Sequence, residues 1–263
     1  MPNNVESTSS HSQSISFRLN PITSTISSLP ENNNNNKTFK SEIYFNPTLK
    51  EKIIQLEPKL HADLSYCHLI DADISIVVNE IIIDKKCTEL WLHGNEITSH
   101  GASILASGLI NNSKLKSLDF SFNPISDLGV HSLSQALLPH QNSSLKILYL
   151  SKNNISNNGV IYLSEMLKIN RTLNELWLSN NDIGDEGVKL LANVLAYYNK
   201  TLKILSLSMN RLITDSSIDY LIEMFENNRT LKQLWINDCN LSEHGKMKLS
   251  EKAHQKRKFK IEL

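Results

Sequence analysis

The sequence contains few cysteines, no excess of charge of either sign and no long apolar run. Its three cysteines, at positions 67, 87 and 239, are too few and too scattered for a disulfide framework. The 27 basic residues balance the 27 acidic ones, which argues against a general nucleic-acid-binding protein. No stretch approaches the ~18–20 apolar residues of a transmembrane helix, and the chain does not open with a signal-peptide pattern. We therefore expect a cytoplasmic or nuclear protein without a membrane partner.

Sequence motifs of catalysis are also absent. The chain has neither the G-x-x-x-x-G-K-[ST] loop of nucleotide hydrolysis nor the G-x-S-x-G turn of serine hydrolases. Its nine histidines fit no metal-binding spacing, and neither His93 nor His100 has a cysteine or carboxylate partner at ligand spacing. Asp185 and Glu186 lie at an expected helix start, where acidic residues favour the helix dipole. We predict that the protein is not an enzyme and has no catalytic residue, metal ion or cofactor.

The first part of the chain differs in composition from the rest. Residues 1–40 are dominated by Ser, Thr and Asn and predict a disordered tail, because their isolated apolar residues cannot offset the chain entropy. Residues 41–59 contain a helix pattern, with Asn46 as N-cap and Pro47 at the first helical position. We expect this helix to cap the following domain through one apolar face, formed by Leu49, Ile53, Ile54 and Leu56.

A nine-residue motif, L-x-x-L-x-L-x-x-N/C, recurs at intervals of about 28 to 30 residues over residues 60–263. Its copies are CTELWLHGN at 87–95, LKSLDFSFN at 115–123, LKILYLSKN at 145–153, LNELWLSNN at 173–181, LKILSLSMN at 202–210 and LKQLWINDC at 231–239. A degenerate copy precedes them at 62–67, and Ile261-Glu262-Leu263 has the spacing of one more strand. About seven repeats and a terminal strand are therefore predicted.

The last motif position forms a column that we expect to turn inward and bond the loops of adjoining repeats. This structural ladder consists of Cys67, Asn95, Asn123, Asn153, Asn181, Asn210 and Cys239. Six rungs of ~4.8 Å separate Cys67 from Cys239, so these two thiols cannot form a disulfide. An aliphatic residue follows two positions later in each repeat, at Leu69, Ile97, Ile125, Ile155, Ile183, Leu212 and Leu241.

A helical pattern with glycine in its first turn completes the repeats. Glycine is a poor helix former, so its recurrence indicates a close approach to the preceding loop. These glycines are Gly101, Gly129, Gly159, Gly187 and Gly245, with Ser217 in the sixth repeat after a one-residue insertion.

These motifs resemble the leucine-rich repeat family, and specifically its ribonuclease-inhibitor-like subclass. The resemblance implies an α/β solenoid, curved into a horseshoe, with a parallel β-sheet on the concave side and helices on the convex side. Periodicity agrees, because parallel strands need crossover connections and single repeats bury their apolar face only by stacking.

Alternation along each strand places the residue between the two motif leucines on the concave face. This middle column reads Asp63, Trp91, Asp119, Tyr149, Trp177, Ser206 and Trp235. Two flanking columns contain Glu89, Ser117, Ile147, Glu175, Ile204 and Gln233, and His93, Ser121, Ser151, Ser179, Ser208 and Asn237. Aromatic residues among small polar ones are typical of a recognition surface. The predicted partner-binding residues are Trp91, Tyr149, Trp177, Trp235, Asp119, His93, Glu89 and Glu175. The alternative is that each tryptophan only covers its neighbouring rung.

Two further patterns have structural and functional interpretations. Glycosylation-type tripeptides begin at Asn142, Asn170, Asn199 and Asn228, just before the strands. We interpret them as repeated turns, favoured by the tolerance of asparagine for left-handed backbone. The last segment is basic, with Lys246, Lys248, Lys252, Lys256, Arg257, Lys258 and Lys260. A basic helix could attract an acidic partner, but the solvated face of a terminal repeat is the favoured interpretation.

The main functional prediction is a non-catalytic adaptor or regulatory scaffold, a monomer that binds an unidentified protein on its concave face. It is similar to the repeat portions of NOD-like receptors and ribonuclease inhibitor. The alternative is a GTPase-activating regulator of a Ran-like small GTPase, because Ran GTPase-activating proteins are built from similar repeats. That resemblance implies an arginine beside the sheet, for which Arg211 is the candidate, although the basic end of this chain departs from the acidic tail of those proteins.

Overall fold

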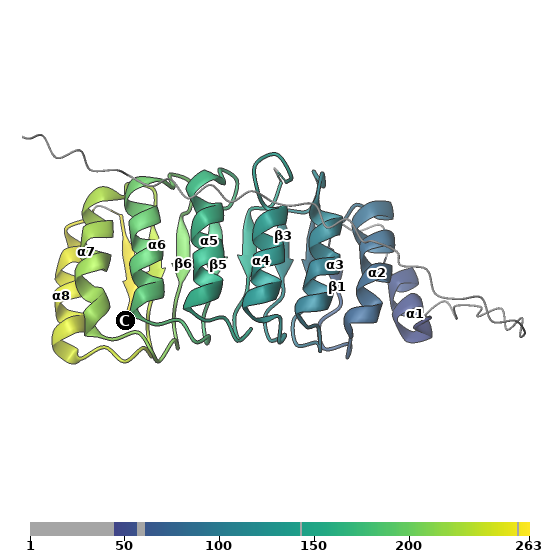
Figure 1. The fold of residues 1–263 in the computed structure, drawn as a ribbon, viewed down its shortest axis with the longest axis horizontal. Helices are drawn as coiled ribbons and strands as arrows, with labels where there is room; N and C mark the ends of the chain where they lie inside the picture. The colour runs from purple at the N-terminus through teal and green to yellow at the C-terminus, as the bar shows by residue number, and fades with distance from the viewer. Residues whose placement is uncertain (1–44, 57–60, 143, 257) are drawn as a thin grey trace, which may run out of the picture. The chain divides into compact units, whose positions relative to one another are not determined.

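The computed structural model describes residues 45–56, 61–142, 144–256 and 258–263 (Figure 1). The predicted tail, residues 1–40, lies outside the described residues. Eight short strands form one parallel sheet in chain order, as the motif spacing predicts. They are β1 (His61–Asp63), β2 (Glu89–Trp91), β3 (Ser117–Asp119), β4 (Ile147–Tyr149), β5 (Glu175–Trp177), β6 (Ile204–Ser206), β7 (Gln233–Trp235) and β8 (Lys260–Glu262). The predicted α/β leucine-rich repeat solenoid is confirmed.

Helices connect successive strands and stand in one row on the same side of the sheet (Figure 1). The regular connecting helices are α3 (Ser99–Leu109), α4 (Ser126–Ala136), α5 (Asn157–Ile169), α6 (Asp185–Tyr197), α7 (Ile218–Asn227) and α8 (Glu243–His254), and α1 (Pro47–Gln55) precedes the first strand. A 3₁₀ turn, η3 (Asp215–Ser217), precedes α7. The first connection is irregular, with the 3₁₀ turn η1 (Asp71–Asp73), the short α2 (Ile74–Ile76) and the π-helical η2 (Val77–Asp84).

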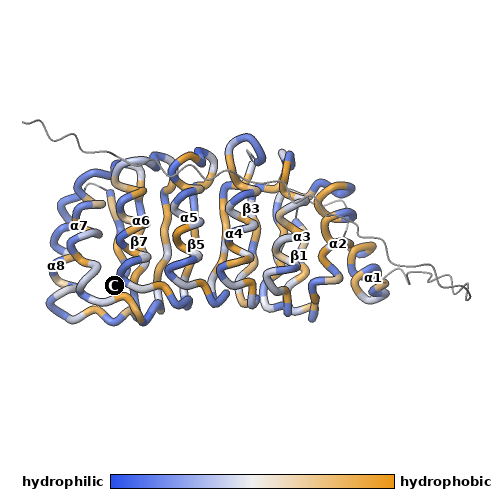
Figure 2. Tube along the Cα trace, in the orientation of Figure 1, coloured by the Kyte–Doolittle hydropathy of each residue, from blue (hydrophilic) through white to orange (hydrophobic). Residues whose placement is uncertain are grey.

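The core lies between the sheet and the helices. Paired strands are in register, so the central leucines Leu90, Leu118 and Leu148 are neighbours on successive strands, and each is fully buried. The apolar residues of each helix form one stripe facing these leucines, which appears in Figure 2 as alternating orange and blue along every helix. A rung alone would leave its stripe exposed, so the rungs are stable only when stacked.

The asparagines of the predicted structural ladder, here called the strand-end ladder, are buried and bond neighbouring rungs, whereas its terminal Cys67 and Cys239 are half-buried. Asn181 is representative: its Nδ2 donates to the carbonyl oxygens of Leu150 (2.9 Å) and Leu178 (3.0 Å), one on each rung. Its Oδ1 accepts from the amides of Asn153 (2.9 Å) and Ile155 (3.1 Å). One side chain therefore satisfies four backbone groups that would otherwise be buried without partners.

The three cysteines are free thiols at structural positions. Cys67 and Cys239 follow β1 and β7, near opposite ends of the sheet, and Cys239 Sγ donates to the carbonyl oxygen of Leu207 at 3.4 Å. Burial raises the pKa of the Cys87 thiol to about 12 and that of Cys239 to about 11. Both thiols are therefore protonated at neutral pH and unsuited to act as nucleophiles.

A second ladder, here called the turn ladder, corrects the prediction for the asparagine tripeptides. None of its asparagines has left-handed backbone, and each is buried. Three follow the end of a helix closely, and Asn142 lies in the loop between α4 and β4. In Asn199, Nδ2 donates to the carbonyl oxygen of Leu167 (2.9 Å), and Oδ1 accepts from the amides of Thr201 (3.0 Å) and Leu202 (2.9 Å). The recurrence therefore reflects inter-rung hydrogen bonding rather than a backbone preference. The ladder consists of Asn142, Asn170, Asn199 and Asn228.

Two predictions of burial are wrong. In α1 the Asn46 side chain caps the helix and Leu49 and Ile53 are buried, but Ile54 is 78 % exposed, because it lies on the solvent side of the helix. In the sixth repeat Leu212 is 57 % exposed and Ile213 fills the aliphatic column with no exposed surface. The one-residue insertion after Asn210 shifts the column by one position.

The close approach predicted for the repeated glycines is confirmed. A Cβ atom on Gly101 would lie 2.4 Å from Asp71 Oδ1 and 2.6 Å from Ile97 Cγ2. Asp71 itself accepts from the amide (2.8 Å) and the hydroxyl (2.6 Å) of Thr98, the N-cap of α3. Asp185 holds Thr214 of the next rung in the same way, so this carboxylate links two rungs in addition to favouring its own helix dipole.

Candidate protein-binding surface

The sheet face without helices, here called the open face, carries the columns predicted from strand alternation. The pairing register places the residues of the middle column next to one another on consecutive strands, and Glu262 of β8 extends it. Glu89, Ser117, Ile147, Glu175, Ile204 and Gln233 form the first flanking column, which His61 and Lys260 extend. The register therefore brings all the predicted partner-binding residues within the strands onto one face. Their role in binding stays a prediction.

A strip of three neighbouring aromatic rings, one stacked pair and one tilted pair, occupies the centre and C-terminal part of the open face. The ring centroids of Tyr149 and Trp177 lie 5.6 Å apart, and those of Trp177 and Trp235 lie 5.9 Å apart. Trp177 and Trp235 are two rungs apart, and the small Ser206 between them is buried. The two indoles therefore lean toward each other over the serine, which gives a continuous aromatic strip. Trp235 Nε1 is buried and has no hydrogen-bond partner among the described residues.

Trp91 belongs to a separate aromatic group at the N-terminal end of the open face. Its ring packs edge-on against His61, with centroids 4.2 Å apart, and His61 Nδ1 lies 3.3 Å from Glu89. Trp91 is 39 % exposed. The three tryptophans therefore do not form one row: one lies with His61, and two belong to the central strip.

Sequence reasoning missed a second group beside Trp91. Tyr66 and Phe122 lie on either side of His93, with ring centroids 5.0 and 4.7 Å from it, and Tyr66 Oη is 2.7 Å from His93 Nε2. His93 Nδ1 also lies 3.8 Å from a carboxylate oxygen of Asp119. This carboxylate comes from the next strand, at a distance that spacing along the chain does not reveal.

Tyr66 and Phe122 share a backbone feature that explains why they were missed. They precede the strand-end ladder, where every repeat has a left-handed residue, with φ of 53° at Tyr66 and 59° at Phe122. This conformation breaks the strand alternation on which the columns were predicted. The signal was nevertheless in the sequence, because Tyr66, Gly94, Phe122, Lys152, Asn180, Met209 and Asp238 occupy the same place in each repeat.

The open face is acidic. Its strand columns contain five carboxylates, at Asp63, Glu89, Asp119, Glu175 and Glu262, and one lysine, Lys260. Burial, and then the charges of Glu175, Asp119 and Glu89, raise the pKa of the Tyr149 phenol above its ordinary value. These three carboxylates therefore act on Tyr149, one ring of the aromatic strip.

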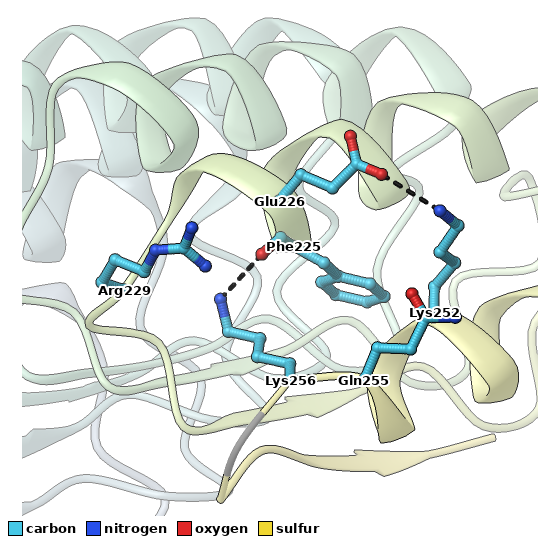
Figure 3. Close-up of a pocket in the computed structure, with 6 residues that line it drawn as sticks. All are labelled: Phe225, Glu226, Arg229, Lys252, Gln255 and Lys256. Atoms are coloured by element: carbon cyan, nitrogen blue, oxygen red, sulfur yellow. Dashed lines mark hydrogen bonds and ion pairs between the residues drawn. The ribbon is translucent and has the colours of Figure 1, made fainter.

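A pocket of about 280 Å³ lies away from these columns, at the C-terminal end of the helical layer (Figure 3). Glu226 on one side of it pairs with Lys252 at 3.1 Å, and the Phe225 ring lies in the centre of the view. Its lining residues are Phe225, Glu226, Arg229, Lys252, Gln255 and Lys256.

Lys256 shows that the basic end of the chain is not only a solvated surface. Its ammonium points inward and donates to the carbonyl oxygens of Phe225 (3.0 Å) and Asn228. Asn228 bonds the equivalent carbonyls, those of Leu195 and Asn199, one rung earlier, so Lys256 continues the turn ladder. Burial, and then nearby cations, lower the pKa of Lys256 to about 8. These cations are Arg229, Lys232 and Lys200.

No group of three or more His, Cys, Asp or Glu side chains within the described residues could hold a metal ion. Arg211, the candidate arginine of the GTPase-regulator alternative, is an exposed loop residue. Over the same part of the chain, no helix is both long and apolar enough to span a membrane.

Comparisons with known proteins identify the repeats. A family model described as leucine-rich repeat matches residues 111–134, 141–164, 170–192 and 198–221. Together with the parallel sheet and its ladders, this match makes the chain a leucine-rich repeat protein. Its repeats are similar to those of the NACHT, LRR and PYD domains-containing proteins, a group of NOD-like receptors.

Among these relatives, protein 4C of Mus musculus is 32 % identical over 196 residues, which cover 74 % of this chain and 20 % of the relative. Protein 14 of Homo sapiens is 29 % identical over 199 residues, 75 % of this chain and 18 % of the relative. The chain therefore spans about a fifth of the length of the curated relatives it matches.

Two of the solved structures that match this chain have lower sequence identity to it than these relatives. One is leiomodin-1 actin-binding site 2, with a TM-score of 0.41 and 18 % identity over 71 % of this chain and 91 % of that chain. The other is the tropomodulin C-terminal domain of Caenorhabditis elegans, with a TM-score of 0.47 and 17 % identity over 59 % of this chain and 92 % of that chain.

The repeats and the relatives support a protein-interaction module. The alternative prediction, a GTPase-activating regulator of a Ran-like GTPase, is not supported by these comparisons.

Proposed function

We propose that the protein is a non-catalytic adaptor or regulatory scaffold that binds a protein partner on its open face. The observation that carries this proposal is the aromatic strip of Tyr149, Trp177 and Trp235, which lies on the sheet face that no helix of the described chain covers. Large aromatic residues provide much of the binding energy in protein interfaces. The three rings of the strip are half-buried, so part of each ring stays in contact with water on this face.

The contacts of the strip also bear on the structural alternative, in which each tryptophan only covers its neighbouring rung. The tilted contact between Trp177 and Trp235 lies over the buried Ser206, so part of that interpretation holds. Trp91 also packs on the neighbouring rung, through His61, but it is still 39 % exposed, which covering that rung does not explain. Tyr66 and Phe122 add exposed aromatic surface beside it, 67 % and 42 % exposed.

The remaining parts of the proposal concern boundaries, state and location. Residues 60–263 form the repeat domain and residues 41–59 cap it, with Leu49 and Ile53 of α1 joined to the core. The protein acts as a monomer. Three free thiols, two of them with raised pKa, suit a reducing compartment such as the cytoplasm.

Affinity capture with matched variants tests the proposal. A triple variant, Trp91→Ala, Trp177→Ala and Trp235→Ala, removes the open-face indoles, and the control, Leu128→Ala, Ile161→Ala and Met247→Ala, removes exposed apolar side chains from α4, α5 and α8. Circular dichroism checks that both fold. We expect quantitative mass spectrometry to find a protein captured by the wild type and the helix variant but lost by the tryptophan variant. Equal capture by all three would refute the proposal.

A further inference from the structure

Two lysine side chains of the chain itself already lie over aromatic rings at the open face. Lys260 Nζ lies 5.3 Å from the ring centroid of Trp235 and 2.5 Å from Glu262. Lys152 Nζ lies 4.7 Å from the ring centroid of Phe122. A cation between an aromatic face and a carboxylate is stabilised by both, because the ring face carries negative potential. On this surface, Lys260 therefore already shows a cation held between an aromatic ring and a carboxylate.

The pair formed by Tyr149 and Trp177 also combines aromatic rings with a nearby carboxylate, but without a cation from the described chain. The two rings stack at an interplanar angle of 24°, and Trp177 Nε1 donates to Glu175 Oε2 at 3.2 Å. Glu175, Asp119 and Glu89 act together on Tyr149. Among the described residues, no lysine or arginine lies over either ring. This aromatic pair therefore lies beside three carboxylates. Glu89 and Asp119 each have a histidine neighbour, His61 and His93, and Glu175 accepts from the Trp177 indole.

We propose that the Tyr149–Trp177 pair binds an arginine side chain of the protein partner, with the guanidinium over the rings and against Glu175 and Asp119. This inference rests on the proposed function and adds the chemistry of the partner. Charge complementarity selects a cationic segment, because five carboxylates face one lysine in the strand columns. Arginine fits better than lysine, because its flat, weakly hydrated guanidinium stacks on rings and donates to a carboxylate at the same time.

Two peptides test the recognition directly. Gly-Arg-Gly-Arg-Gly carries the cation, and the same peptide with citrulline in place of arginine has nearly the same shape without the charge. We expect the arginine peptide to shift the indole N–H signal of Trp177 in ¹H–¹⁵N NMR spectra, with an affinity at least threefold higher than that of the citrulline peptide. Equal shifts from both peptides, or none from either, would overturn the inference.

A charge-removing variant locates the site. Glu175→Gln keeps the size of the side chain and should lower the affinity for the arginine peptide about threefold to tenfold, as expected for loss of ~0.7–1.4 kcal/mol. The matched control, Glu186→Gln, removes an exposed carboxylate from α6 and should leave the affinity unchanged. The same affinity for both variants contradicts the assignment, because it would indicate attraction by overall charge alone.

The result separates this inference from the proposed function. If the arginine peptide does not bind while capture of a partner still depends on Trp91, Trp177 and Trp235, the arginine site is wrong and the proposed function stands. If capture does not depend on the tryptophans, the proposed function fails, whatever the peptides show.

Discussion

The two asparagine ladders and the open face belong to the same rungs but differ in how much they vary. Within each ladder nearly every rung uses asparagine, because one amide side chain can both donate to backbone carbonyls and accept from backbone amides of adjoining rungs. The middle column of the open face instead changes from carboxylate to indole, phenol and hydroxyl along the sheet. Repetition therefore marks residues that build the solenoid, and variation marks residues that are free to recognise a partner.

Substitution within a ladder should lower the free energy of unfolding more than substitution on the open face. Asn199→Ala removes hydrogen bonds to Leu167, Thr201 and Leu202 and leaves their backbone groups buried without partners. At ~1–3 kcal/mol for each unsatisfied group, partly relieved by relaxation, we expect the free energy of unfolding to fall by about 3–5 kcal/mol. Urea denaturation measures it.

The control for this variant is Asn193→Ala, on the exposed surface of α6. It should change the free energy of unfolding by less than about 0.5 kcal/mol. A similar loss in both variants would mean that the ladder has no special role.

The insertion in the sixth repeat places a buried and an exposed aliphatic residue next to each other, so their contributions to stability can be compared directly. Ile213→Ala should lower the free energy of unfolding by about 2–4 kcal/mol, because it creates a cavity in the core. Leu212→Ala, at the neighbouring exposed position, should change it by less than about 0.5 kcal/mol. Thermal and urea unfolding of the two variants test this; the reverse order would restore the column predicted from spacing alone.

The repeat architecture was predictable from the sequence because its signals are local and periodic. Motif leucines, the strand-end ladder and the glycine positions recur along one chain, and each has a single structural use. Leu212 and Ile54 were misplaced because an insertion and a helix rotation change burial without changing composition. The turn ladder was visible as a recurring asparagine, but its cause lies in carbonyl groups of the preceding rung.

The details of the candidate site depend on contacts between rungs, which periodicity does not resolve. The middle column was predictable, but the leaning of Trp177 onto Trp235 follows from the small size of Ser206 between them. The placement of Phe122 beside His93 follows from a left-handed backbone residue. The contacts between side chains on the open face therefore could not be predicted from the sequence, although the fold could.

The stacked strip should contribute less to stability than the ladders. A double-mutant cycle with Tyr149→Ala and Trp177→Ala should give a coupling of about 0.5–1.5 kcal/mol in the free energy of unfolding, the usual value for a stacked aromatic pair. The cycle of Trp91→Ala with Trp177→Ala should give a coupling near zero, because Trp91 contacts His61 instead. Equal couplings would show that all tryptophans of the column act together.

Lys256 should give the smallest effect, because it is a ladder position occupied by a charged and partly exposed group. Its folded pKa of about 8 lies below the ordinary 10.5, so between these pH values the unfolded state binds more protons and stability from this group rises with pH. The full shift would correspond to ~3 kcal/mol, but screening by solvent reduces it to about 1 kcal/mol or less. Lys256→Gln keeps a donor for Phe225 and Asn228 and removes the titration. Buried Cys87 titrates in both proteins, so the wild-type free energy of unfolding minus that of the variant isolates Lys256. In urea unfolding this difference should increase from pH 8 to pH 10. A flat or falling difference would place the ammonium in water rather than on the ladder.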